Sequence, residues 1–201
     1  DVYGTYDPDT GRVRQVKAPV TDDVLLAHLK GQQPYGVYLL MKDIIRALAV
    51  DFDSDQLCYP LAFRAEAWRQ GIFGYIERSK SKGYHVWMFF EEQGVLARKA
   101  RQVAGQILST IGQPHTEIFP KQDVLDEHTS YGNFINAPLF GAFVPKGRTV
   151  FVHPGKPRQP YSDQWELLAG VQRIGEGKLD EVIGNYGLPE ADQPREACES
   201  D

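Results

Sequence analysis

The chain has 201 residues, of which 42% are hydrophobic and 24% charged, and its formal net charge is −5. This composition is typical of a globular protein and excludes a disordered or fibrous chain. No apolar run approaches the ~20 residues that a membrane helix needs, so we expect no membrane partner. The two cysteines, Cys58 and Cys198, form no metal-ligand pattern, and we expect free thiols in a reducing cytoplasm. Because the first residue is not methionine, we interpret the chain as part of a longer multidomain protein.

Most of the negative charge lies at the C-terminus. Residues 189–201 hold five acids against one arginine, and we expect this polar segment to be a flexible tail. The rest of the chain is nearly neutral. Net charge therefore does not exclude a nucleic-acid partner, because a neutral body can carry a basic groove beside an acidic site.

The predicted elements alternate between strands and helices. The segment Val2–Val20 is typical of a hairpin, with its turn at Asp7–Gly11, and Thr21-Asp22-Asp23 begins a helix that ends near Lys30. Later strands are predicted at Tyr35–Met41, Arg46–Asp53, Phe73–Arg78, Tyr84–Phe90, Thr116–Phe119, Asn133–Ala137 and Thr149–Val152. Later helices are predicted at Leu61–Gln70, Gln93–Ile111, Asp163–Arg173 and Leu179–Tyr186.

This mixture of ββ and βα neighbours favours an α+β fold, an RRM-like sheet with helices on one face. We divide the core, residues 1–188, into a small N-terminal α/β unit at 1–45, an RRM-like sheet at 46–160 and C-terminal helices at 161–188.

The first candidate site is the segment Ala49-Val50-Asp51-Phe52-Asp53. Alternate residues of a strand share a face, so Asp51 and Asp53 point together, away from Val50 and Phe52. Two neighbouring carboxylates repel each other unless a cation lies between them, and Mg²⁺ or Mn²⁺ prefers such oxygen ligands. The alternative is a strand end with ordinary surface acids.

The second candidate is the basic turn that precedes His85. Arg78, Ser79, Ser81 and Lys82 offer cations and hydroxyls that can hold phosphate oxygens. His85 shares a strand face with Trp87 and Phe89, and it projects onto the acidic face if its strand neighbours that of Asp51. The alternatives are a solvated turn and a histidine satisfied by a core hydrogen bond.

The third candidate is the segment Thr116–Asp123. Glu117, in a short apolar strand, is the predicted third carboxylate, and Asp123 is its alternative. Lys121 is a candidate phosphate contact. The aromatic side chains Phe119, Tyr131 and Phe134 are candidate stacking surfaces, although aromatics at strand spacing are more often part of a core.

In this order, the three segments resemble the archaeo-eukaryotic primase superfamily. Its pattern is an acidic pair on a strand, then a small residue two positions before a histidine, then a hydrophobic residue followed by an acid. The closer resemblance is to bacterial primase-polymerases of conflict and CRISPR-associated systems, and it covers about residues 28–175. It is carried by AVDFD at 49–53, ERSKSKGYHVWMFF at 77–90, FPKQD at 119–123 and GNFINAPL at 132–139.

The resemblance implies a nucleotidyltransferase that adds dNTPs or NTPs to a 3′-hydroxyl on a DNA template or primer, with two Mn²⁺ or Mg²⁺ ions. It implies that Asp51, Asp53 and Glu117 hold the metals. His85 would hold the triphosphate tail, with further contacts from Ser79, Ser81, Lys82 or Arg78, and weaker ones from Lys30 and Lys121. One departure is Gly83, because the superfamily commonly has serine at this position.

Two other functions stay open. A non-catalytic RRM-like module would bind single-stranded nucleic acid without any need for the carboxylates. A metal-dependent nuclease or replication initiator usually has paired histidines, whereas the five here, at positions 28, 85, 115, 128 and 153, show no close pair.

Overall fold

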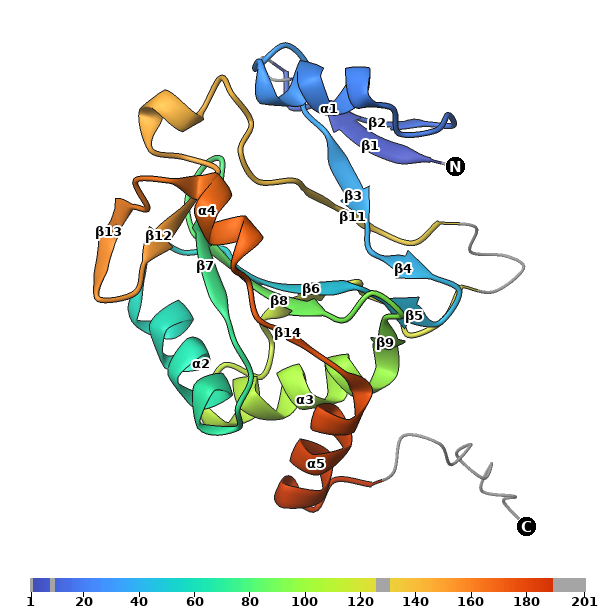
Figure 1. Cartoon of the computed structure of the whole chain (residues 1–201), viewed down its shortest axis with the longest axis vertical. Helices are drawn as coiled ribbons and strands as arrows, with labels where there is room; N and C mark the ends of the chain where they lie inside the picture. The colour runs from blue at the N-terminus through green and yellow to red at the C-terminus, as the bar shows by residue number, and fades with distance from the viewer. Residues whose placement is uncertain (1, 8–9, 126–130, 190–201) are drawn as a thin grey trace.

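The computed structural model describes residues 2–7, 10–125 and 131–189. A large mixed sheet lies at the centre of the protein, with helices below it and a smaller sheet above it in Figure 1. None of the helices in these ranges is long and apolar enough to cross a membrane. The arrangement confirms the α+β class that the sequence predicted.

The large sheet carries the candidate site. Its strand order is β10–β6–β8–β7–β12–β13, with β14 paired in parallel to β8. The strands are β6 (Ala47–Phe52), β7 (Tyr75–Arg78), β8 (Tyr84–Phe90), β10 (Glu117–Phe119), β12 (Val150–His153), β13 (Lys156–Pro160) and β14 (Arg173–Ile174). The central pair, β6 and β8, is antiparallel over six residue pairs, which confirms that the strands of Asp51 and His85 are neighbours.

Helices cover one face of this sheet. Leu48, Val50 and Phe52 of β6 are 0–4% exposed and belong to the main core. That core is completed by α2 (Cys58–Arg69), α3 (Ala97–Thr110) and α5 (Glu176–Tyr186). The apolar residues of α3 recur at helical spacing, from Ala100 to Leu108, so one side of the helix packs on the sheet.

The smaller sheet covers part of the opposite face. Its order is β11–β3–β1–β2, built from β1 (Tyr3–Tyr6), β2 (Val13–Val16), β3 (Gly36–Tyr38) and β11 (Phe134–Asn136). Val37 and Ile135 pack against Ala49 and Trp87 of the large sheet. The helix α1 (Asp22–Leu29) is held through His28, whose ring nitrogens lie 2.8 Å from the carbonyl of Pro138 and 2.9 Å from the backbone nitrogen of Tyr35. The predicted hairpin is therefore present as β1 and β2.

The predicted boundary at residue 45 does not separate the two sheets. The predicted division places Asn133–Ala137 with the sheet at 46–160, but its strand β11 pairs with β3 in the smaller sheet. Gly4 and Gly36 make room for it, because a Cβ at either position would lie 2.4 Å or less from the ring of Phe134. Chain order alone does not reveal such a return.

Several predicted elements have different bounds in the structure. The helix expected from Gln93 begins at Ala97, because β9 (Val95–Leu96) pairs with β5 (Ile44–Ile45), which also pairs with β4 (Leu40–Met41). The helix expected at Asp163–Arg173 is shortened to α4 (Gln164–Ala169), and the chain then adds β14 to the large sheet. A 3₁₀ turn occupies Val144–Lys146. The predicted tail lies outside the described residues beyond Pro189.

Candidate active site

Four ionisable residues form one row across the open face of the large sheet. In the strand register, Glu117 of β10 is opposite Asp51 of β6, Asp51 is opposite His85 of β8, and His85 is opposite Glu77 of β7. Residues directly opposite each other in a sheet share a face, with Cβ atoms ~5 Å apart. The pairing of four strands therefore brings together groups that are up to 66 positions apart in the chain.

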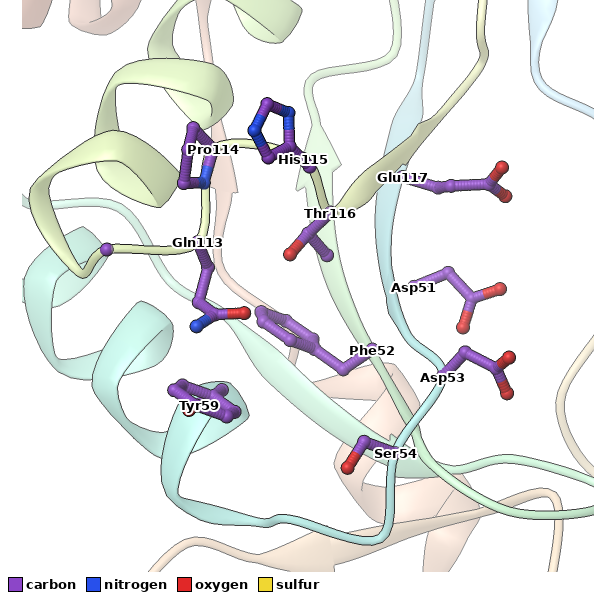
Figure 2. Close-up of a pocket in the computed structure, with 11 residues that line it drawn as sticks. Asp51, Phe52, Asp53, Ser54, Tyr59, Gln113, Pro114, His115, Thr116 and Glu117 are labelled. Carbon is purple, nitrogen blue, oxygen red and sulfur yellow. The ribbon is translucent and has the colours of Figure 1, made fainter.

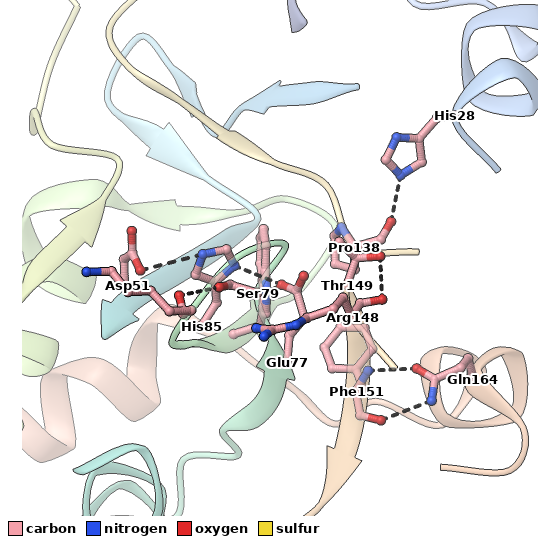
Figure 3. Close-up of polar contacts among 12 residues, drawn as sticks. His28, Asp51, Glu77, Ser79, His85, Pro138, Arg148, Thr149, Phe151 and Gln164 are labelled. Carbon is pink, nitrogen blue, oxygen red and sulfur yellow. Dashed lines mark hydrogen bonds and ion pairs between the residues drawn. The ribbon is translucent and has the colours of Figure 1, made fainter. Parts of the chain in front are cut away.

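His85 is held in the middle of this row (Figure 3). It is 7% exposed, its Nδ1 lies 2.9 Å from Glu77 Oε2, and its Nε2 lies 3.6 Å from Asp51 Oδ1. Burial by itself lowers the pKa of His85, but the charge and hydrogen bond of Glu77, with the charge of Asp51, raise it above its ordinary value. The imidazole is thus fixed in position and favoured in its cationic form.

Asp51 and Asp53 mark the end of β6. Asp51 has a side chain that is 29% exposed, and Asp53 is exposed just beyond the strand. Burial raises the pKa of Asp51, His85 opposes this, and the like charges of Asp53, Glu117 and Glu77 raise it further. Figure 2 shows the carboxylates of Asp51, Asp53 and Glu117 directed to one side, as the strand alternation predicted for the pair.

Glu117 and Asp123 have different surroundings. Glu117 lies in the row beside Asp51, and its Oε1 is 2.7 Å from the ammonium of Lys121. Asp123 lies outside the strand and is bound by Arg101, with Nε 2.5 Å from Oδ1. Of the two alternatives, Glu117 is the acid that the sheet brings next to Asp51. Lys121 is placed against this carboxylate.

The basic turn is packed against the end of β6. Ser79 is 5% exposed and its hydroxyl donates to the carbonyl of Lys82 at 2.7 Å, so this side chain closes the turn. Gly83 has φ +92°, and a Cβ there would lie 2.2 Å from the carbonyl oxygen of Phe52. Glycine thus replaces the serine of the superfamily pattern because only glycine allows this close approach.

The remaining candidate cations and hydroxyls lie in different parts of the structure. Ser81 and Lys82 are exposed, whereas Arg78 shares the strand face of Ile76, on the helix side of the sheet. Lys80 lies 3.7 Å from the ring centre of Tyr6 in the smaller sheet, and burial lowers its pKa. Lys30, exposed at the end of α1, belongs to the N-terminal unit.

The three acids suit a divalent cation in the type of donor that they supply. All supply carboxylate oxygens. Burial, followed by the like charges of its neighbours, raises the pKa of Asp51, and a bound cation would oppose both effects. Lys121 already places a positive charge at Glu117. In the rotamers seen, however, no three His, Cys, Asp or Glu side chains within the described ranges are grouped tightly enough to hold a metal ion. Metal binding would require the carboxylates to converge.

Two cavities lie on the large sheet, and the first is lined by Asp51 and Glu117 of the row. One, of about 350 Å³, lies where β6 meets β10, and Figure 2 shows that its lining residues Tyr59 and Gln113 are on the side away from the three carboxylates. The other, of about 400 Å³, lies between the two sheets and is almost wholly apolar. Its lining includes Trp87 and Phe89, the next two residues after His85 on the same strand face.

Glu77 was not predicted as a site residue. It is 1% exposed, although a glutamate is rarely buried so completely. Its Oε2 contacts the Nε1 of Trp87 at 2.6 Å as well as His85. The available signal was its alternation with the apolar residue Ile76 in a predicted strand, which places Glu77 on the face of Tyr75. Only the register shows that this face meets His85.

Comparison with known proteins identifies the family of this chain. A search of curated proteins found no match. Among solved structures, the polymerase domain of Mycobacterium tuberculosis ligase D in complex with DNA is similar, with a TM-score of 0.48 and 16% sequence identity over 96% of this chain and 85% of that chain. The model of the archaeo-eukaryotic primase domain of TOTE conflict systems matches residues 10–182, which supports a primase-type nucleotidyltransferase function. The chain therefore belongs to the archaeo-eukaryotic primase family of TOTE conflict systems.

Proposed function

We propose that this domain is a template-dependent primase-polymerase that adds nucleotides to the 3′-hydroxyl of a nucleic-acid strand. The observation that carries the proposal is the row Glu117–Asp51–His85 on one open sheet face, with Asp53 beside it. Family membership supports the reaction class. A non-catalytic binding module would give no reason to place three mutually repelling carboxylates next to a buried histidine.

The acids and the histidine have separate roles in this proposal. Asp51, Asp53 and Glu117 would hold Mg²⁺ or Mn²⁺, which would activate the attacking hydroxyl and stabilise the leaving pyrophosphate. His85 presents Nε2 toward the acids, where a cationic N–H can donate to an oxygen of the triphosphate. The exposed Ser81 and Lys82 lie on the turn that leads to His85 and would add phosphate contacts.

Primer extension is the direct test. A primed DNA template is incubated with labelled dNTPs or NTPs, each with Mn²⁺ or Mg²⁺, and the wild type is expected to lengthen the primer. Asp51→Asn combined with Asp53→Asn should abolish extension while circular dichroism shows an intact fold. Asp123→Asn is the matched control, because Asp123 pairs with Arg101 and not with the row. Full extension by the double variant would overturn the proposal.

Nucleotide binding tests the role of His85 separately. His85→Ala removes a charge-assisted contact worth ~1.5–3 kcal/mol, so we expect the Michaelis constant for nucleotide to rise roughly tenfold to a hundredfold. Binding of primed DNA should change much less. His153→Ala is the control, since His153 is an exposed histidine at the end of β12. An unchanged Michaelis constant with intact activity would make His85 merely structural.

A further inference from the structure

Among the residues that the structure describes, the buried carboxylate of Glu77 is contacted by two donors, and both come from β8. Its Oε2 lies 2.9 Å from His85 Nδ1 and 2.6 Å from Trp87 Nε1. On its other side, Glu77 is opposite Phe151 of β12, which has no side-chain polar group. An ionised carboxylate buried this fully is costly unless it is paired and hydrogen-bonded. The imidazole of His85 is the partner that can carry the compensating charge.

This pairing determines which nitrogen of His85 faces the acidic row. A carboxylate only accepts hydrogen bonds, so Nδ1 must carry a proton to bond with Glu77. Nε2 is then the nitrogen directed toward Asp51, 3.6 Å away. Figure 3 shows the imidazole lying between the two carboxylates. The same arrangement of carboxylate and histidine orients metal-binding imidazoles, and loss of such an outer partner typically costs ~10–100-fold in affinity or activity.

We propose that Glu77 is a positioning residue that fixes the ring of His85 and directs its Nε2 toward the triphosphate. This role rests on the proposed function in one respect, which is the identity of the group that Nε2 meets. The orientation itself depends only on the contact between Glu77 and His85. Glu77 belongs to the row, but its side chain is only 1% exposed, so it acts through the histidine.

The orientation can be tested without nucleotide. In protein with ¹⁵N-labelled histidine, NMR should show a slowly exchanging proton on Nδ1 of His85, assigned by its loss in His85→Ala. Glu77→Gln keeps the size of the side chain but removes the charged acceptor, so this proton should shift and exchange faster. Trp87→Phe removes only the other donor and should leave the signal in place. A wild-type Nδ1 without a bound proton, or a signal unmoved by Glu77→Gln, would overturn the proposal.

Kinetics then test the functional consequence. Glu77→Gln should raise the Michaelis constant for nucleotide about tenfold, the lower end of the effect of losing such a partner, with a smaller change in kcat. In the His85→Ala background, the same substitution should add less than about twofold, because residues that act as one unit are not additive. Trp87→Phe should also change the Michaelis constant by less than about twofold.

These outcomes separate a positioning role from a structural one. Equal effects of Glu77→Gln with and without His85, or an equal effect of Trp87→Phe, would show that Glu77 merely supports the sheet. If the wild type does not extend primers while the NMR result holds, the proposed function fails and the orientation of His85 by Glu77 stands.

Discussion

The open face of the large sheet has two halves with opposite character. At the end of β6, the row from Glu117 to Glu77 is charged, and Asp53 beyond it is exposed. A few residues along the same strands, Ala49 and Trp87 are 0–3% exposed beneath Val37 and Leu39 of the N-terminal part. One half is covered and apolar, and the other carries the candidate chemistry.

The difference shows how stability from apolar burial offsets the cost of a charged cluster in the same sheet. Burial of apolar surface between the two sheets and beneath the helices stabilises the chain at ~25 cal/mol per Å². The charged row is unfavourable instead, because burial and then the like charges of its neighbours raise the pKa of Asp51. Sites that favour function over stability are expected to violate the local rules in this way. The following substitutions test whether the charged half and the apolar half respond differently.

Glu117→Gln should have the largest effect, and it should fall on activity alone. Loss of a metal-binding carboxylate removes several kcal/mol of transition-state stabilisation, so we expect extension to fall by about a hundredfold or more. Asp123→Asn should stay within about threefold of the wild type, because its partner is Arg101. Primer extension across Mn²⁺ concentrations is the measurement. The reverse order would make Asp123 the third ligand.

Leu39→Ala should affect the covered half and spare the charged one. Leu39 is 9% exposed and borders the apolar cavity, so its loss should cost about 2 kcal/mol, the low end for such truncations. Urea unfolding measures this change. The Michaelis constant for nucleotide, measured below the unfolding transition, should be unchanged. A large rise in that constant would mean that the two halves are coupled.

Gly83→Ser tests the junction between the basic turn and β6. The substitution puts a Cβ 2.2 Å from the carbonyl of Phe52 at φ +92°, which costs of order 1–3 kcal/mol or forces the turn to move. We expect weaker nucleotide binding together with lower stability. Gly112→Ser is the control, since it also has positive φ but open space around its Cβ. Equal behaviour of the two variants would exclude the close approach as the cause.

Asp51→Asn should give the smallest effect, seen in the absence of metal. Because its pKa is raised, folded Asp51 holds a proton more tightly than the unfolded chain does. Its favourable contribution is complete below the ordinary value of 3.8 and is lost as the pH rises through the folded pKa. The asparagine variant avoids that loss, so at pH 7 it should melt about 1–3 °C higher than the wild type. A lower melting temperature at pH 7 would contradict the raised pKa of Asp51.

The sequence by itself determined the local parts of this site. Alternation in Ala49–Asp53 placed Asp51 and Asp53 on one face, and the order of the motifs along the chain indicated the family. The basic turn before His85 was also predictable, because Gly83 and the neighbouring polar residues mark a tight connection between two apolar strands. These features depend on residues close together in the chain.

Only the tertiary structure decided the rest. The row requires β10, β6, β8 and β7 to pair in one register, and a shift of one residue would move each side chain to the other face. The return of β11 to the smaller sheet depends on a match between Phe134 and two distant glycines. Glu77 could not be predicted as a site residue, because its contact with His85 depends on the pairing of β7 with β8. Pairing between strands is set by packing over the whole core, which local sequence does not encode.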